Sequence, residues 1–78
     1  MKKTAIVILS IPSKCILKDV ELPMNISADR VIEAIAQVYK VDKISHLICE
    51  NPIALISGKK TLGELGIHDG SVIKYIEG

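Results

Sequence analysis

Two apolar runs at the start of the chain predict a pair of strands. Residues 4–11 are rich in β-branched side chains and stop at Pro12, which is typical of a strand that ends in a turn. Residues 15–22 form a second run, in which alternation would place Lys18 among the inward-facing apolar side chains. A bulge at this position that turns Leu17 inward is the alternative, and the pattern leaves both open.

An amphipathic helix follows and has the clearest signal of all the elements. Apolar side chains recur at three- and four-residue steps, which is the period of a helix with one buried face. Ser27 is a good N-cap, and Asp29 is favourable at the positive end of the helix dipole. A single helix with one apolar face is expected to pack on a sheet. The apolar positions are Ala28, Val31, Ile32, Ile35, Val38 and Tyr39.

Three further strands are expected, over 46–49, 53–56 and 71–77. Before the last of them, Thr61 and Glu64 have the spacing of a capping box, and Gly66 stands where a left-handed residue would end a single helical turn. The order ββαββ, helical turn, β predicts an α+β fold, with a mixed sheet of four to five strands on one helix, in one domain over residues 1–78. Three apolar side chains would close the open end of the core: Leu62, Leu65 and Ile67.

Charge and length narrow the class of partner. The 78 residues carry a net charge of +1, and the basic residues are dispersed, whereas nucleic-acid binding needs a clustered basic face. No apolar run approaches the ~20 residues of a membrane span, so we expect no direct membrane insertion. The first apolar run stops at Ser10 and Pro12 with no cleavage site after it, which argues against a signal peptide. We therefore expect a cytoplasmic protein.

Candidate catalytic and metal-binding side chains do not form a set. Cys15 and Cys49 are too far apart in the sequence for a chelating motif, and we expect both thiols to pack in or beside the sheet. His46 lies three residues before Cys49 and would point to the opposite face of a strand. His68 falls in a turn without acidic or cysteine neighbours that could complete a ligand set. The sequence therefore predicts no catalytic residues, no metal site and no cofactor.

The last strand indicates a candidate protein-interaction surface. If Ile73 and Tyr75 face the core, Lys74 and Ile76 point to the face of the sheet away from the helix. Ile48 on the third strand is a weaker candidate, because its facing depends on a register that the pattern does not decide.

The first strand extends this surface. We expect Ile6 and Ile8 to fill the core, which would place Val7 on the outer face with its apolar neighbours Ala5 and Leu9. An apolar outer face on a small domain indicates a protein partner, and a homodimer is one form of it. The alternative is that long neighbouring side chains cover the face.

Residues 61–73 resemble the C-terminal third of ubiquitin-like domains. Ser57-Gly58, Leu62, Gly66-Ile67 and Gly70 are similar to the pattern of the YukD/EsaB family, small bacterial ubiquitin-like proteins that accompany type VII secretion systems. The resemblance in element order covers nearly the whole chain.

This resemblance implies a ubiquitin-like β-grasp fold, with the last strand parallel to the first at the centre of the sheet. It also implies a non-catalytic cytosolic component or regulator that binds a cytosolic or membrane-anchored part of the secretion machine. Ile76 would match the apolar position on the last strand of ubiquitin that belongs to its recognition patch.

A carrier activated at its C-terminus for sulfur transfer or conjugation is the alternative. Such proteins resemble this chain in fold but end in an extended Gly-Gly tail, whereas here Tyr75-Ile76 is followed by Glu77 and Gly78. We expect no conjugation for this reason. A homodimeric structural role through the outer face of the sheet is a third hypothesis.

Overall fold

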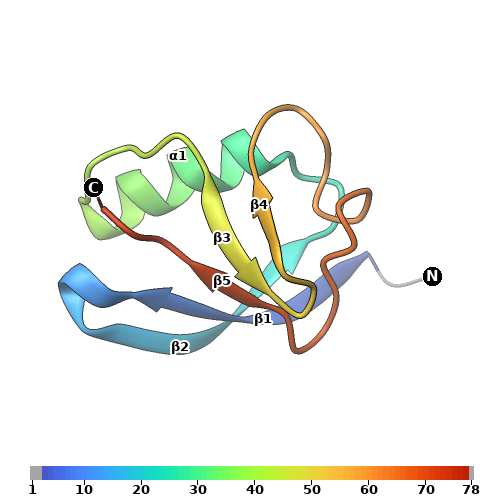
Figure 1. The fold of residues 1–78 in the computed structure, drawn as a ribbon, viewed down its shortest axis with the longest axis horizontal. Coiled ribbons are helices and arrows are strands. Elements are labelled where there is room, and N and C mark those ends of the chain that lie inside the picture. Colours follow the sequence, from blue (N-terminus) through green and yellow to red (C-terminus); the bar gives the residue numbers. More distant parts are fainter. Residues whose placement is uncertain (1–2, 78) are drawn as a thin grey trace.

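The computed structural model describes residues 3–77. The elements in chain order are β1 (Thr4–Ile11), η1 (Pro12–Lys14), β2 (Ile16–Pro23), α1 (Ala28–Tyr39), β3 (Leu47–Glu50), β4 (Ala54–Ile56) and β5 (Val72–Lys74). The strands form one mixed sheet in the order β2-β1-β5-β3-β4, and α1 covers one of its faces (Figure 1). The predicted α+β architecture is confirmed.

Strand β5 lies at the centre of the sheet, parallel to β1 and antiparallel to β3. The predicted return of the last strand beside the first is therefore confirmed. The first strand has the predicted ends, whereas the ends of the other strands differ from the predicted ranges by one to a few residues. The β5 ladder stops at Lys74, although the Tyr75 N–H still donates to the Ser10 carbonyl at 2.8 Å. Backbone pairing with a neighbour, which the apolar pattern does not report, decides these boundaries.

Helix α1 begins and ends as local chemistry requires. The Ser27 hydroxyl accepts a hydrogen bond from the Arg30 N–H at 3.3 Å, which confirms the predicted N-cap. The helix ends at Tyr39, and its C-cap, Lys40, has a left-handed backbone with φ 55°. The prediction that Val38 belongs to the buried stripe is wrong, since this side chain is exposed. At about 100° per residue it falls at the margin of the stripe. The buried helix residues are Ala28, Val31, Ile32 and Ile35.

Strand β1 faces the opposite way from the prediction. Ile6 is 53% exposed and Ile8 is only half-buried, so neither fills the core. Val7, which was expected on the outer face, is fully buried. The buried side chains of β1 are Ala5, Val7, Leu9 and Ile11.

The reversal has a simple cause. A period of two shows which residues share a face but not which face meets the helix, and both faces of β1 are rich in apolar residues. The outer set contains Thr4 and Ser10 beside the two isoleucines, whereas the buried set is apolar throughout. This difference in polarity is the signal in the sequence that identifies the inner face.

Strand β2 pairs with β1 in a regular register along its whole length. The proposed bulge is therefore absent from β2, and the alternative that turns Leu17 inward is wrong, because Leu17 is 73% exposed. Lys18 stands opposite Leu9 and so lies on the helix side. Its ammonium reaches the Tyr39 ring, 5.7 Å from the centroid. An edge strand tolerates this lysine because the charged end can remain near solvent while the stem covers apolar surface.

The segment before β5 forms the predicted helical turn. The Thr61 N–H donates to Glu64 Oε1 at 2.9 Å, and the Glu64 N–H donates to the Thr61 hydroxyl at 3.2 Å, which confirms the capping box. Gly66 has φ +83°, as expected of a left-handed terminating residue. Leu62 and Ile67 are buried in the core. This turn therefore closes one end of the fold before the chain enters β5.

Candidate protein-interaction surface

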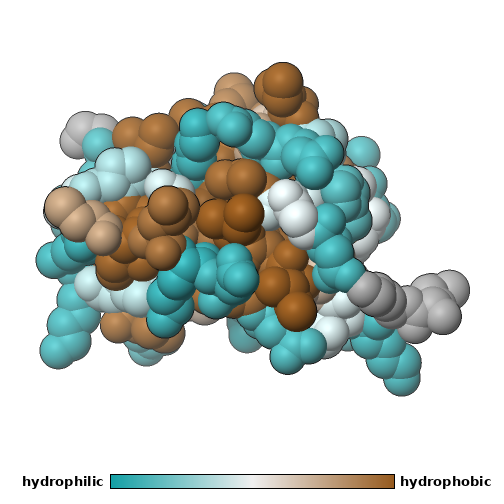
Figure 2. Space-filling view, turned by 90° about the horizontal axis from the view of Figure 1, so that it is seen from below, coloured by the Kyte–Doolittle hydropathy of each residue, from teal (hydrophilic) through white to brown (hydrophobic). Residues whose placement is uncertain are grey.

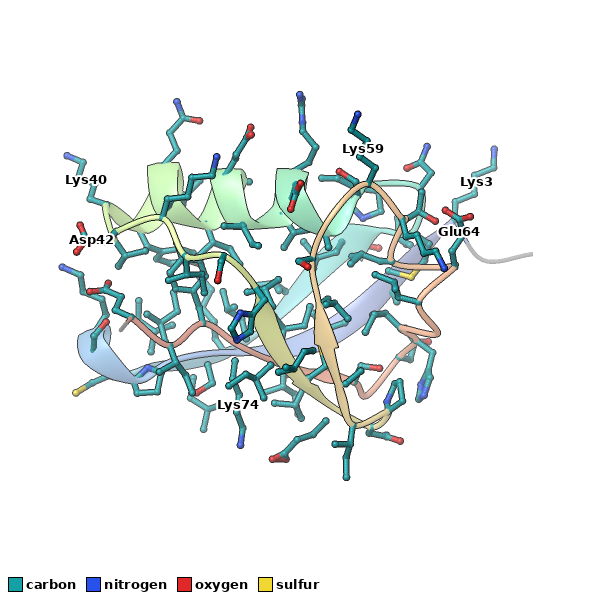
Figure 3. All side chains as sticks on the ribbon, turned by 45° about the horizontal axis from the view of Figure 1, so that its top comes forward. Lys3, Lys40, Asp42, Lys59, Glu64 and Lys74 are labelled. Atoms are coloured by element: carbon teal, nitrogen blue, oxygen red, sulfur yellow. The ribbon has the colours of Figure 1, made fainter. Side chains whose placement is uncertain are left out.

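The outer face of the sheet, away from α1, carries the predicted site residues on β5 and β3. Ile73 and Tyr75 are fully buried, so alternation sends Lys74 and Ile76 outward, and Ile76 is 46% exposed. Figure 3 shows the Lys74 side chain pointing away from the sheet on the side opposite the helix. Ile48 pairs with Lys74 across the β3–β5 ladder and is half-buried on this same face. The tertiary structure thus decides the facing that the sequence left open.

Ile48 and Ile76 line one shallow pocket of about 380 Å³. Ile44, in the connection between α1 and β3, contributes a third apolar side chain. We call this the Ile48–Ile76 surface. The polar residues of the lining come from the same connection, and we call them the polar rim: Asp42, Lys43, Ser45 and His46.

A buried tyrosine positions the connection that forms the rim. The Tyr75 hydroxyl donates to the Asp42 carbonyl at 2.5 Å. Burial is the main reason that the pKa of this phenol is raised, so it stays protonated as a donor. On the rim, Ser45 Oγ lies 3.1 Å from His46 Nδ1. Residues 42–45 were missed by sequence reasoning, because they form no periodic element; the tyrosine contact and the packing of Ile44 against the core bring them beside Ile76. His46, expected at the start of the third strand, lies just before β3.

The arrangement suits the binding of an apolar side chain from another protein. Interfaces commonly combine a small apolar centre with a polar rim that excludes water. The three isoleucines of the lining offer apolar contact to such a side chain. The surface can therefore hold and orient an anchor residue by apolar contact.

An ion pair borders this surface. The Lys74 ammonium donates to Glu50 Oε1 at 2.6 Å, and both side chains are partly exposed. Figure 2, which views the outer face, shows hydrophobic areas on both sides of hydrophilic residues near its centre. Because Lys74 lies between Val72 and Ile76 in the chain, the pair interrupts the apolar side chains of this face.

Val7 does not belong to the Ile48–Ile76 surface. It lies in the core on the other side of the sheet, where no partner can reach it in the folded protein. The fourth predicted site residue is therefore a packing residue.

The two cysteines lie in different environments. Cys49 is buried, and burial raises the pKa of its thiol to about 11, so the reactive thiolate is disfavoured. Cys15 is exposed with a left-handed backbone, φ 54°. The prediction that both thiols pack in or beside the sheet is correct for Cys49 and wrong for Cys15, which follows η1 in the β1–β2 turn.

Within residues 3–77, no group of three or more His, Cys, Asp or Glu side chains is placed to hold a metal ion. No helix of the described chain is both long enough and apolar enough to cross a membrane.

A larger open cavity, of about 1100 Å³, lies at the other end of the fold. It is lined by the start of β1, residues 24–25 and part of 61–69. Several of its polar side chains already serve the fold: Glu64 belongs to the capping box, and an Asp69 carboxylate oxygen accepts the Ile6 N–H at 2.8 Å. We therefore place the candidate site at the Ile48–Ile76 surface.

Comparison with known proteins supports the fold. No protein-family model and no curated protein matches the chain. Among solved structures, the ubiquitin-like domain of tubulin-binding cofactor B is similar, with a TM-score of 0.77 and 17% identity, over 99% of this chain and 92% of that one.

Two further structures show the same likeness. The C-terminal ubiquitin-like domain of mouse tubulin-specific chaperone e has a TM-score of 0.77 and 12% identity, over 97% of this chain and 88% of that one. The ubiquitin-like domain of yeast Ddi1 has a TM-score of 0.67 and 18% identity, over 94% and 90%. The strand order, the single sheet-packed helix and these neighbours show that the chain has a ubiquitin-like β-grasp fold.

Proposed function

We propose that this chain is a non-catalytic, cytosolic protein-interaction module that binds its partner through the Ile48–Ile76 surface. The observation that carries the proposal is that Ile44, Ile48 and Ile76, from three separate segments, line one pocket on the exposed face of the sheet. The partner is a protein that inserts an apolar side chain there. A pocket of this size buries one anchor residue, and the polar rim would exclude water around it.

The test compares two exposed apolar residues of the outer face. Ile76→Asp places a carboxylate in the pocket, whereas Leu17→Asp makes the same change on the edge strand, outside the pocket lining. Both variants are expected to fold, because both side chains are exposed. In co-purification from the native cell, wild type and Leu17→Asp should retain the same partner, and Ile76→Asp should lose it. Equal retention by both variants would contradict the proposal.

We further propose that the partner belongs to a type VII secretion system, of which this chain is an accessory component or regulator. Support comes from the resemblance to the YukD/EsaB family at Ser57-Gly58, Leu62, Gly66-Ile67 and Gly70. Deletion of the gene should impair secretion of the substrates of that system or alter their expression. The wild-type gene should restore secretion, whereas the Ile76→Asp gene should not. Unchanged secretion and expression while the system is active would exclude this role.

The carrier alternative concerns Gly78, which lies outside the described residues. Intact-mass measurement of the protein from its native cell separates the two functions. An unmodified mass agrees with the interaction module, and a thiocarboxylate or a covalent adduct at Gly78 would establish the carrier.

Sedimentation over a range of concentrations tests the homodimer hypothesis. Ile76→Asp would abolish self-association only if the outer face of the sheet mediates it.

A further inference from the structure

A second apolar strip lies on the outer face, on the other side of Lys74 from Ile76. It consists of Ile6 and Ile8 on β1 and Val72 on β5, which we call the Ile6–Val72 strip. Ile8 pairs with Val72 across the parallel ladder. Ile6 is 53% exposed, and the other two side chains are half-buried. None of the three lines the Ile48–Ile76 pocket.

Carboxylates border the strip along its length. Glu21 stands opposite Ile6, and Asp19 stands opposite Ile8, both on β2. On the other side, Glu50 stands opposite Val72 on β3.

Little positive charge balances these groups. Within the described strands, Lys74 is the one lysine on this face, and its ammonium donates to Glu50 at 2.6 Å. Lys18 lies on the opposite face, over the Tyr39 ring. The margin formed by Asp19 and Glu21 on β2 therefore keeps a net negative charge.

The backbone around the strip is already bonded. Strand β1 pairs with β2 and β5, and β5 pairs with β1 and β3. A segment that docks on these central strands receives no backbone hydrogen bonds from them. It must satisfy its own N–H and carbonyl groups, because burying them unpaired is costly, and an α-helix does so internally.

The width between the bordering carboxylates fits such a helix. Asp19 on β2 and Glu50 on β3 are separated by three strand spacings, or ~14 Å at ~4.8 Å each. An α-helix with its side chains is ~10–12 Å across. A helix that lies along the strands would cover the apolar strip, and basic residues on its flank would reach Asp19 and Glu21.

We propose that the Ile6–Val72 strip docks an amphipathic helix of a partner protein whose apolar stripe is flanked by Lys or Arg. The apolar strip supplies the buried contact, and the acidic margin selects the sign of charge of the partner. A second copy of this chain is disfavoured on this face, because it would bring an equally acidic margin. This docking site is separate from the Ile48–Ile76 surface.

The probe for the test is a synthetic helical peptide with a leucine stripe and lysine flanks. A peptide with the same stripe and glutamate flanks is its control. Each is titrated into the isotope-labelled full chain and followed by the backbone amide resonances. Saturable shifts should centre on Ile6, Ile8 and Val72, and the lysine peptide should bind about tenfold more tightly than the glutamate peptide.

Two charge reversals then distinguish the effect of the acidic margin on binding from the effect of the net charge of the chain. Asp19→Lys should weaken binding of the lysine peptide about fivefold. Glu33→Lys makes the same change in net charge on α1, whose outer side faces away from the sheet, and should leave binding unchanged. Both side chains are exposed, so both variants are expected to fold.

Five results would overturn the proposal. Four come from the titrations: the absence of saturable shifts, equal affinity for the two peptides, equal weakening by both reversals, and shifts centred on Ile48 and Ile76. The fifth is self-association of the chain with its strip covered by a second copy. The Ile76→Asp test of the proposed function is independent of all these outcomes, since Ile76 lies outside the strip.

Discussion

The Lys74 ammonium donates to Glu50 Oε1 at 2.6 Å, and this pair stands between the two apolar surfaces of the outer face. Along β5 and the residues after it, Val72 belongs to one surface and Ile76 to the other, with Lys74 between them. The pair is partly exposed, so its contribution to stability is about 0–1 kcal/mol. Its greater effect is to divide an apolar face that would otherwise be continuous.

Lys74→Met should therefore change the exposed apolar surface more than stability. We expect the free energy of unfolding to fall by less than about 1 kcal/mol, because the lost pair is partly solvated. The two apolar surfaces would merge into a larger exposed patch, and the folded protein should bind more of a hydrophobic dye than wild type. Glu33→Met is the control, because it breaks a second exposed ion pair, with Lys43 at 3.6 Å, through a change on α1, away from the outer face. Equal dye binding by Lys74→Met and Glu33→Met would contradict the prediction.

The facing of β1 can be tested with one substitution at each of two adjacent positions. Val7→Asp should prevent folding, because Val7 is fully buried and an unpaired carboxylate there is strongly unfavourable. Ile6→Asp should fold and lose no more than about 1 kcal/mol, as is usual for exposed positions. Circular dichroism with thermal unfolding distinguishes them. The reverse outcome would show that β1 faces the other way.

Tyr75→Phe tests the contact that positions the rim of the Ile48–Ile76 surface. It removes the hydroxyl that donates to the Asp42 carbonyl, and we expect a loss of about 1 kcal/mol in chemical denaturation. Amide hydrogen exchange should rise in residues 42–46, and the rest of the core should keep its protection. Unchanged exchange in this segment would show that the tyrosine does not position it.

The same variant should change the dependence of stability on alkaline pH. Burial raises the pKa of the Tyr75 phenol above its ordinary value of 10.0, so the folded state holds this proton more tightly than the unfolded state. The contribution of the phenol to stability is complete below about pH 10 and is lost as the pH rises through the folded pKa. Unfolding curves of wild type should show this decline, and those of Tyr75→Phe should show less of it.

The capping box leads to two expected effects, one on stability and one on the dependence of stability on acidic pH. Thr61→Ala removes the acceptor of the Glu64 N–H and should cost about 1 kcal/mol of unfolding free energy. Hydrogen bonds from Thr61 are the main reason that the pKa of Glu64 lies below 4.5. The stabilising effect of this carboxylate is therefore present above the unfolded pKa and is lost as the pH falls through the folded value.

Glu64→Gln is the control for this titration, because it keeps an acceptor oxygen but cannot ionise. Its unfolding curves should show a weaker decline in acid than those of wild type. An identical acid dependence in the two proteins would contradict the role given to the carboxylate.

The two thiols should differ in reactivity. A thiol-directed dye should label Cys15 in the folded protein, whereas Cys49, buried and with its pKa raised to about 11, should react only after unfolding. Cys15→Ser should abolish labelling under native conditions. Fast labelling of the Cys15→Ser protein would show that the strand containing Cys49 opens readily.

Local signals in the sequence determined much of this fold. The Ser27 cap, the Thr61–Glu64 box and the left-handed Gly66 depend on neighbouring residues, so they can be inferred without tertiary contacts. Alternation at Ile73 and Tyr75 likewise identified Lys74 and Ile76 as outward, because the alternation of a strand continues past the end of β5.

Only the tertiary structure decided the faces of β1 and β3 and the composition of the pocket. The pattern could not say which of two apolar faces meets a helix that covers one side of the sheet, so Val7 was placed outside although it lies in the core. Ile44 joins Ile48 and Ile76 because a tyrosine hydroxyl holds the connection beside the sheet. Contacts between distant segments depend on packing and closure of the whole chain, which local periodicity does not encode.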